Sequence, residues 1–495
     1  MIKFYIVIDI VGLEYGHLSS QLIPNISGLA SEGESAVMEP VFPGVTCTVQ
    51  ASILSGTYPN QHGIICNGFY DRINRNVSFW EQSSDHVQTD RIWDTTHRKT
   101  SYDDKIKAKT KLQSKTKTRP KHKSKSKTKI QALVSESSSS SHSFNLKTAV
   151  LFWQNTMFSN ADIVVTPRPI HLDNGVVMWC YSKPAGYYDQ DLKPKYGEFN
   201  LASYWGPLAS PISSKWISEA TTYTLEKYRP NFLFTYVPHI DYSAQRFGKN
   251  SSHVRDDLKV ADGIVENIVQ KTVELGIRDE SQFIIISEYG FNDVSGAVPL
   301  NLRLRDAGLL ATRAIQEKEY IDYEYSEAFA MVDHQIAHIY VKEGFVEQTK
   351  KVLGQITGVD RVLDKQEKKH LKIDHERSGE LLAVADQDKW FSYYWWYEKE
   401  RAPPFAGNVD IHRKPGYDPL ELFIEPNTRS ISQNTNLVKG SHGRKANYLT
   451  KEGLSLYLSN RETSILNKNG GNSPPRVNCV DLGKYLTNLV LSGLF

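Results

Sequence analysis

Cysteine is scarce in this 495-residue chain, and the four cysteines form no CxxC pair. The sequence therefore contains neither the framework of a disulfide-rich secreted domain nor a zinc knuckle. Long apolar runs are missing too, since no stretch approaches the ~18 residues that a membrane-spanning helix needs. The apolar start, residues 4–11, contains Asp9 and is followed by no small-residue cleavage site, which argues against a signal peptide. These absences predict a cytoplasmic protein without a transmembrane segment.

A strong net charge is also missing, but the near balance hides an uneven distribution. The 59 basic and 56 acidic residues give a net charge of +3. Residues 105–130 hold eleven lysines, one arginine and no acid, so 47 basic residues face 56 acidic ones elsewhere, a balance of −9. A serine run, 137–141, follows. Because this stretch has too little apolar surface to offset the entropy of ordering, residues 101–145 are expected to be a disordered insertion.

The positive charge of this insertion has two interpretations. It suits a nucleic acid or an anionic membrane surface as a partner, and a basic tract can also act as a nuclear signal. With no acid, no interleaved aromatic residue and no apolar face, a solvated expansion of a surface loop is the favoured interpretation.

Apolar runs of strand length recur along the rest of the chain. The first, residues 3–10, has almost no polar break, as in a parallel strand that is buried on both faces. Segments with helical spacing of apolar residues separate several of these runs, which predicts an α/β fold with a doubly wound, mostly parallel sheet and helices on both faces. The other expected strands are 147–152, 231–237, 282–287, 336–341 and 380–385, and the expected helices are 254–275, 345–356 and 482–491.

We expect one catalytic α/β core that two insertions interrupt. Its N-terminal part is 1–100, and the disordered Lys/Ser-rich insertion is 101–145. Residues 146–230 are expected to hold a core strand plus a cap insertion, and 231–495 to complete the core. Within the third segment, residues 155–215 are rich in Pro, Tyr and Trp without a clear period, which suggests a cap over the sheet edge.

The most informative stretch is FPGVTCTVQASILSGTYPNQHGIICNGFYD, residues 42–71. Thr46 follows a Pro-Gly turn and opens a helical segment that ends near Gly56. A hydroxyl at a helix N-terminus lies beside unpaired backbone N–H groups, which favour an anionic ligand such as phosphate. Alone, Thr46 would be read as a helix N-cap. The Gly-x-x-Pro turn, the His-Gly-Ile-Ile turn and Asn67 that follow at fixed distances favour the functional interpretation.

This pattern resembles the type I phosphodiesterase/nucleotide pyrophosphatase family of the alkaline phosphatase superfamily, near the phosphonoacetate hydrolases. In that family a strand ends in a metal-binding Asp, and a Thr nucleophile follows, ten residues before the Gly of a turn and twenty-one before an Asn. Thr46, Gly56 and Asn67 reproduce both distances. The resemblance implies Asp9 as a metal ligand, Thr46 as nucleophile and metal ligand, and Asn67 as the catalytic and substrate-binding donor to the transferred group.

Further positions extend the resemblance over most of the chain and also depart from it. Asp241 matches a metal-binding Asp, but Gln245 stands four residues later where the family has His. Glu288 and Tyr289 replace the Asp-His of an Asp-His-Gly motif. Gly440–Gly443 matches a C-terminal motif whose His442 is another implied ligand.

The resemblance implies two divalent cations held by Asp9, Thr46, Asp241, Glu288 and His442. With two imidazoles replaced, this set is rich in oxygen, which suits Mn²⁺ or Mg²⁺ as well as Zn²⁺. Candidate substitute ligands are His239 and the pair Asp333 and His334, which are otherwise groups that orient carboxylates or simply pack. Gln245 and Tyr289 themselves are further candidates. Arg168 could bring a guanidinium to a phosphate, although a surface arginine is the commoner case.

The sequence thus predicts a metal-dependent hydrolase of phosphodiester or pyrophosphate bonds, acting through a phospho-Thr46 intermediate on a small, nucleotide-like substrate. A phosphomonoesterase or phosphonate hydrolase with the same residues is a second interpretation. A pseudoenzyme that binds a nucleotide or polyanion, with the lysine tract contributing, is a third.

Overall fold

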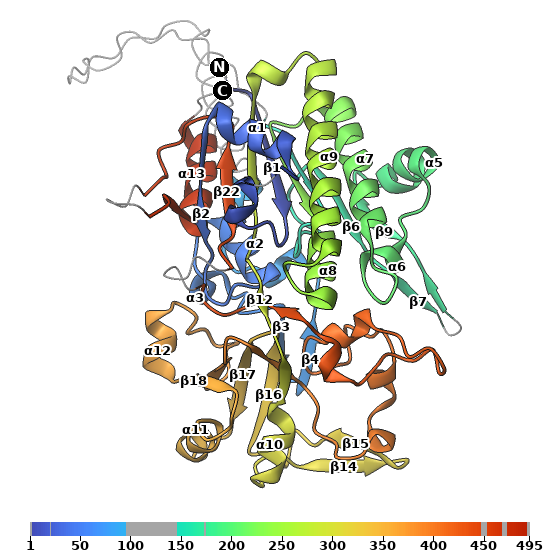
Figure 1. Cartoon of the computed structure of the whole chain (residues 1–495), viewed down its shortest axis with the longest axis vertical. Coiled ribbons are helices and arrows are strands. Elements are labelled where there is room, and N and C mark those ends of the chain that lie inside the picture. The colour runs from blue at the N-terminus through green and yellow to red at the C-terminus, as the bar shows by residue number, and fades with distance from the viewer. Residues whose placement is uncertain are drawn as a thin grey trace, which may run out of the picture.

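A nine-stranded mixed sheet forms the centre of the computed structural model, which describes residues 2–19, 21–95, 146–172, 175–446, 453–467 and 473–492 (Figure 1). Most neighbouring strands are parallel, while β22 and β9 run antiparallel to their neighbours. The expected α/β class with a mostly parallel sheet is confirmed. In spatial order the strands are β23 (Arg476–Asn478), β2 (Glu34–Glu39), β22 (Leu456–Ser459), β11 (Ser281–Ile286), β1 (Phe4–Ile10), β10 (Phe232–Val237), β5 (Thr148–Leu151), β6 (Ile163–Pro167) and β9 (Cys180–Lys183).

The central strand β1 shows why these residues form this sheet. All seven of its residues are buried, and its two edges pair with β10 and β11. A strand in that position is apolar almost throughout, so its one charged residue, Asp9, stands out at its carboxyl end. The strands expected at 3–10, 147–152, 231–237 and 282–287 are confirmed as β1, β5, β10 and β11.

Two groups of helices flank the large sheet (Figure 1). In one group α2 packs on α13, and α3 follows α2. In the other, α7, α8 and α9 pack on one another, α1 contacts α9, and α5 and α6 contact α7. Within the described ranges, no helix combines the length and apolar character needed to cross a bilayer. The bounds are α1 (Pro24–Glu32), α2 (Thr46–Ser55), α3 (Pro59–His62), α5 (Lys193–Tyr196), α6 (Leu201–Tyr204), α7 (Pro211–Tyr228), α8 (His239–Phe247), α9 (Ser252–Glu274) and α13 (Cys479–Ser492).

A small lobe, residues 294–438, has its own apolar core and lies below the large sheet in Figure 1. Its main sheet is antiparallel, in the order β16 (Ala328–Asp333), β17 (Ile336–Val341), β19 (Leu381–Ala385) and β18 (Val359–Leu363). Its other elements are β13 (Gly296–Pro299), β14 (Thr312–Ile315), β15 (Lys318–Ile321), β20 (Lys389–Ser392), α10 (Leu300–Asp306), α11 (Val346–Leu353) and α12 (Lys365–His370).

Three short strand pairs complete the fold. The hairpin of β3 (Gly68–Asp71) and β4 (Asn76–Phe79) packs on the core of the small lobe. The pair of β12 (Asn292–Asp293) and β21 (Gly440–Ser441) brings the segment before His442 beside the one after β11. The hairpin of β7 (Ile170–Leu172) and β8 (Gly175–Val177) projects from the large sheet (Figure 1).

Two expectations about the architecture are wrong. The runs at 336–341 and 380–385 form β17 and β19 of the small lobe, and they pair antiparallel instead of joining the large sheet. A fully buried apolar strand looks alike in either sheet, and only its distant partners decide where it pairs. Residues 155–215 contribute β6 and β9 to the edge of the large sheet instead of forming only a cap over it. The expected disordered insertion, 101–145, lies outside the described residues.

Candidate active site

The candidate site lies at the edge where three adjacent strands of the large sheet end. Asp9, near the end of β1, is in register with Tyr236 of β10 and Ile286 of β11. Asp241 follows β10 in the first turn of α8, and Glu288 follows β11 by two residues. Since β1, β10 and β11 are parallel, their carboxyl ends bring these three carboxyl groups to one edge, where open α/β sheets place their ligands.

Thr46 is the first residue of α2, and it points its hydroxyl into this edge. The preceding Val45 is extended, and the helix closes at Gly56, whose φ of 65° is left-handed. Thr46 is only 2% exposed, and its Oγ1 lies 3.2 Å from the hydroxyl oxygen of Tyr289. The structure thus places the predicted nucleophile in contact with the residue that replaces the expected imidazole.

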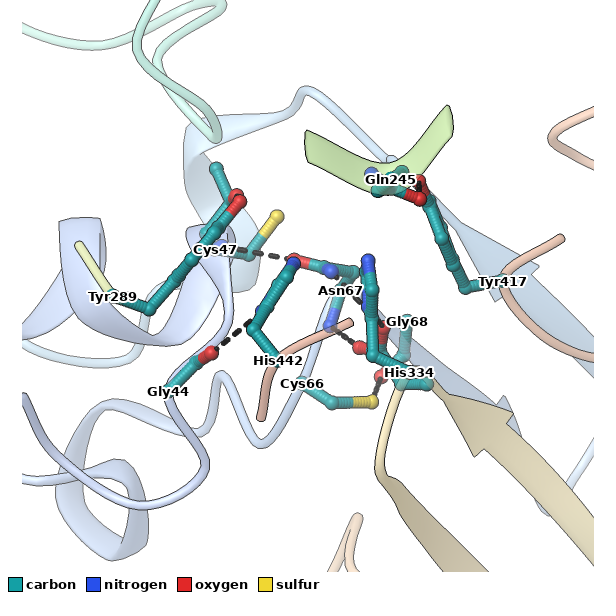
Figure 2. Close-up of polar contacts among 12 residues, drawn as sticks. Gly44, Cys47, Cys66, Asn67, Gly68, Gln245, Tyr289, His334, Tyr417 and His442 are labelled. Atoms are coloured by element: carbon teal, nitrogen blue, oxygen red, sulfur yellow. Dashed lines mark hydrogen bonds and ion pairs between the residues drawn. The ribbon is translucent and has the colours of Figure 1, made fainter. Parts of the chain in front are cut away.

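Asn67 lies just before β3 and beside Cys47, the residue after Thr46 (Figure 2), and Asp333 holds it in place. Its side-chain Oδ1 accepts a hydrogen bond from the Cys47 backbone N–H at 3.0 Å. Both its backbone N–H and its Nδ2 donate to the Asp333 carboxylate, at 2.9 and 3.1 Å. Because an amide Nδ2 carries two hydrogens, one remains for a ligand. The Cys47 N–H, by contrast, is already taken.

Asp9 and Glu288 form a pair of fully buried carboxyl groups. One Asp9 oxygen accepts from the Gln50 amide at 3.1 Å, while its Oδ1 and both oxygens of Glu288 have no hydrogen-bond partner. Burial raises the pKa of Asp9 to about 7. Burial first, and the Asp9 carboxylate second, raise the pKa of Glu288 well above its usual range. Two such groups side by side create a strong local demand for positive charge.

Asp241 is surrounded by protein donors. Its Oδ2 accepts from Gln245 Nε2 at 2.6 Å, and its Oδ1 accepts from the Tyr289 hydroxyl at 3.4 Å. The Tyr417 hydroxyl in turn donates to Gln245 Oε1 at 2.9 Å (Figure 2). Burial raises the pKa of Asp241 to about 7, and the hydrogen bonds from Gln245 and Tyr289 limit that rise.

Two neutral imidazoles stack beside Asp241. The rings of His334 and His442 lie 3.8 Å apart, and each also stacks on a tyrosine, Tyr417 and Tyr289 respectively. His442 Nδ1 donates to the Gly44 carbonyl at 2.9 Å, so its Nε2 is the unprotonated nitrogen, 3.8 Å from Asp241 Oδ1 and without a partner. Burial lowers the pKa of both histidines well below the usual range, which keeps them neutral.

The site has two candidate positions for a divalent cation, one between Asp9 and Glu288 and one beside Asp241. The side chains fit a cation better at the first position. The unpartnered oxygens of Asp9 and Glu288, with the Thr46 hydroxyl nearby, suit a hard cation that prefers oxygen. Asp241 and His442 offer a free imidazole nitrogen, but both carboxylate oxygens already accept hydrogen bonds. Among the described residues, no three His, Cys, Asp or Glu side chains gather into one metal-binding group.

The substitute ligands considered from the sequence lie elsewhere or have other contacts. His239 turns to α9, where its Nε2 lies 3.0 Å from the Asp257 carbonyl. Asp333 binds Asn67, and its Oδ1 also lies 2.7 Å from His334 Nδ1, so this pair orients the amide. Arg168 is exposed, and its guanidinium contacts Met157 and the Phe158 ring on the surface. A substrate contact by Arg168 stays a prediction.

Sequence reasoning assigns no contact within the site to two of its residues. Gln50, which binds Asp9, lies four residues after Thr46, so helical spacing places it on the same face of α2 and could have identified it. Tyr417, which fixes Gln245 and stacks on His334, belongs to the small lobe, 172 residues after Gln245 along the chain. No spacing in the sequence links it to the other residues.

A small pocket opens beside Asn67 and Cys47, the residue after Thr46. Its lining is mixed: Ile64, Ile65 and Phe69 contribute apolar side chains, while Ser78, Glu81, His86 and Asn155 contribute polar ones.

Comparison with known proteins shows the family to which this chain belongs. The family model for type I phosphodiesterase/nucleotide pyrophosphatase matches residues 5–418. Ectonucleotide pyrophosphatase/phosphodiesterase family member 3 from Bos taurus is 37% identical over 85 residues, 16% of this chain and 10% of that protein. An uncharacterized pyrophosphatase/phosphodiesterase from Schizosaccharomyces pombe is 19% identical over 304 residues, 59% of this chain and 45% of that one. The chain thus spans less than half the length of these curated relatives.

Solved structures share the fold at low sequence identity. Murine ectonucleotide pyrophosphatase/phosphodiesterase 5, an inactive threonine-to-alanine variant in complex with AMP, is 13% identical with a TM-score of 0.57 over 99% of this chain and 95% of that one. Phosphonoacetate hydrolase from Sinorhizobium meliloti, in complex with phosphonoformate, is 13% identical with a TM-score of 0.57 over 99% and 96% of the two chains.

Proposed function

We propose that this chain, which belongs to the type I phosphodiesterase/nucleotide pyrophosphatase family of hydrolases, cleaves phosphodiester or pyrophosphate bonds with Thr46 as its nucleophile. The observation that carries the proposal is the position of Thr46. Its hydroxyl lies at a helix N-terminus, opposite an Asn67 amide that Asp333 fixes and beside the paired carboxyl groups of Asp9 and Glu288. The threonine-to-alanine variant described as inactive in the murine neighbour supports the same role.

In the first step, Thr46 Oγ1 forms a bond to phosphorus as the bond to the leaving-group oxygen breaks. The Thr46 proton passes to the Tyr289 oxygen as the Tyr289 proton moves to Asp241 Oδ1, and the leaving-group oxygen departs with the bonding electron pair and takes a proton from solvent. The second hydrogen of Asn67 Nδ2 and the N-terminus of α2 stabilise the negative charge that develops on the phosphoryl oxygens. The product of this step is a phosphorylated Thr46.

In the second step, the oxygen of a water molecule forms a bond to phosphorus as the bond to Thr46 Oγ1 breaks, and the proton held by Asp241 returns through Tyr289 to restore the Thr46 hydroxyl. The unprotonated Nε2 of His442 has no protein partner and lies beside Asp241, so it can accept the proton of that water. When bound, a divalent cation would lower the pKa of the Thr46 hydroxyl and offset charge on the phosphoryl group. Asp9, Glu288 and Thr46 would hold it, with Mn²⁺, Mg²⁺ and Zn²⁺ as the candidate ions.

The substrate is expected to be a small phosphoester, with a nucleotide as one class. The pocket beside Asn67 and Cys47 lies next to the proposed nucleophile, and its mixed lining includes hydrogen-bonding groups of His86 and Asn155 that a polar ligand could use. The AMP bound to the murine neighbour is consistent with such a ligand.

The test is hydrolysis of bis(p-nitrophenyl) phosphate with added Mn²⁺, Mg²⁺ or Zn²⁺, alongside the matching monoester and phosphonoacetate. Cleavage of the diester is expected to fall at least about 10³-fold in Thr46→Ala. Thr48→Ala, a buried threonine two residues along the same helix, is the matched control and should keep activity. Full activity of Thr46→Ala, or no hydrolysis by the wild type with any of the three cations, would contradict the proposal.

A further inference from the structure

We infer that this chain binds one divalent cation, at Asp9, Thr46 and Glu288, and that Tyr289 and Gln245 fill the second position, beside Asp241, with hydrogen-bond donors of the protein. The inference amends the two-cation expectation. It rests on the proposed function only for the premise that a divalent cation binds at all.

The first observation is that two donors occupy the space beside Asp241. Each of its oxygens accepts a hydrogen bond, one from Gln245 Nε2 and one from the Tyr289 hydroxyl. Each oxygen keeps a further lone pair, but the places that two imidazole ligands would take are filled by groups that present hydrogens to the carboxylate, so a cation in those places would have to displace both donors. Asp241 is therefore stabilised as an acceptor of two neutral donors, without a cation.

The second observation is that both donors are fixed in orientation. The Tyr417 hydroxyl donates to Gln245 Oε1, so Nε2 faces Asp241; turned over, Gln245 would place its oxygen against the carboxylate. Tyr289 is 5% exposed and stacks on His442 with ring centroids 3.4 Å apart. Neither side chain can swing away without losing a second buried contact, a hydrogen bond for Gln245 and a ring stack for Tyr289.

The third observation is the contrast with Asp9 and Glu288. There Gln50 Nε2 donates to a single oxygen of Asp9, the Thr46 hydroxyl and the Gln50 amide lie close to Glu288, and three carboxyl oxygens have no well-formed hydrogen bond in the described residues. Three buried carboxyl oxygens without partners would each carry a desolvation cost, and one divalent cation would satisfy them together. Two carboxylates and one doubly charged ion also balance in charge.

Tyr289 then takes part in the proposed reaction as the acceptor of the Thr46 proton. Its hydroxyl forms hydrogen bonds with both Thr46 and Asp241. It therefore occupies the place in which a second cation would otherwise link these two residues. A phenol there acts on the Thr46 hydroxyl through a hydrogen bond, and it adds no positive charge to the site.

Metal content measured by inductively coupled plasma mass spectrometry after equilibrium dialysis against Mn²⁺ tests the inference without any assay of activity. The wild type is expected to hold one Mn²⁺ per chain. Asp9→Asn or Glu288→Gln should weaken binding at least about 10-fold, whereas Asp241→Asn should keep one ion with an affinity within about threefold of wild type. Two ions in the wild type, or loss of binding in Asp241→Asn alone, would overturn the inference.

A gain of binding provides the converse test. The double variant Gln245→His/Tyr289→His replaces both donors by imidazoles, and it is expected to bind a second Mn²⁺ beside Asp241 and His442. The control Tyr325→His/Gln355→His adds two imidazoles at exposed positions and should remain at one ion. Should the double variant not fold, the wild-type and Asp241→Asn stoichiometries still decide.

The two proposals fail separately. Two ions in the wild type would refute the single-cation inference while diester hydrolysis continued. One ion with no hydrolysis under any condition would refute the proposed function and leave the inference in place.

Discussion

The ring of Tyr289 lies face to face with the imidazole of His442, with centroids 3.4 Å apart and planes 7° from parallel. This stack directs the Tyr289 hydroxyl between Thr46 Oγ1 and Asp241 Oδ1. A residue that looks like a lost ligand in the sequence therefore connects the predicted nucleophile to a buried carboxylate.

Removing only that hydroxyl isolates its contribution. In Tyr289→Phe the ring can still stack on His442, while Thr46 loses its hydrogen-bond partner. We expect kcat for diester cleavage to fall about 100-fold, the size typical of a lost proton-transfer partner, with KM changed less than about threefold. Tyr394→Phe removes a buried hydroxyl that has no hydrogen-bond partner, and its kinetics should match the wild type. Equal kcat values for Tyr289→Phe and wild type would refute the role.

Asp333 is expected to act through Asn67. Asp333→Asn weakens the acceptor that receives both the backbone N–H and the Nδ2 of Asn67, so the amide loses its fixed orientation. We predict a loss of roughly 1–3 kcal/mol in the free energy of unfolding. Asp333→Asn should lower activity, as Asn67→Ala does. The double variant should be no less active than Asn67→Ala alone. Additive losses in the double variant would show that Asp333 acts independently.

Cation binding should raise thermal stability through the carboxyl pair. A ligand at 100 times its Kd adds about 2.7 kcal/mol to the apparent free energy of unfolding. We expect Mn²⁺ to raise the Tm of the EDTA-treated wild type and of Asp241→Asn. The Tm of Asp9→Asn should respond weakly or not at all in differential scanning fluorimetry. If Mn²⁺ raised the Tm of Asp9→Asn as much as that of the wild type, the cation would have to bind elsewhere.

The buried His62 is expected to make the free energy of unfolding depend on pH. Its Nδ1 accepts the Ile64 backbone N–H at 3.1 Å, which requires an unprotonated nitrogen, and burial lowers its pKa to about 3 from 6.5. Since the unfolded chain takes up this proton near pH 6.5, the stabilisation is present above that pH and is lost as the pH falls towards 3.

The comparison of wild type with His62→Gln isolates this effect from other titrating groups. The difference between their free energies of unfolding should be largest above pH 7 and should shrink steadily between pH 6.5 and 4, as measured by urea denaturation at each pH. A difference that stays constant over this range would contradict a neutral buried His62.

The sequence predicts the elements of the site whose signal is local. The four apolar runs that form β1, β5, β10 and β11 are recognisable because strands buried on both faces lack polar breaks. The spacing of Thr46, Gly56 and Asn67 is set by one helix and the turns that follow it, so it is readable from the chain alone. Asp9 and Glu288 are placed by the ends of predicted strands.

The remaining contacts depend on pairings between distant segments. Asp333 meets Asn67 across 266 residues, and Tyr417 meets Gln245 across 172. Sequence reasoning also misses the small lobe that supplies Asp333 and Tyr417, because the apolar runs of β17 and β19 look like strands of the large sheet. A substitution such as Tyr289 can be noticed in the sequence, but its hydrogen bonds follow only from the three-dimensional arrangement.

The central claim is that hydrolysis passes through a covalent intermediate on Thr46. Its most direct test is the stereochemical course at phosphorus, measured with a phosphodiester made chiral by sulfur and oxygen isotope substitution. Two successive in-line displacements, by Thr46 and then by water, each invert the configuration, so the account predicts net retention. Net inversion would mean that water attacks the substrate directly, and it would contradict the nucleophilic role of Thr46.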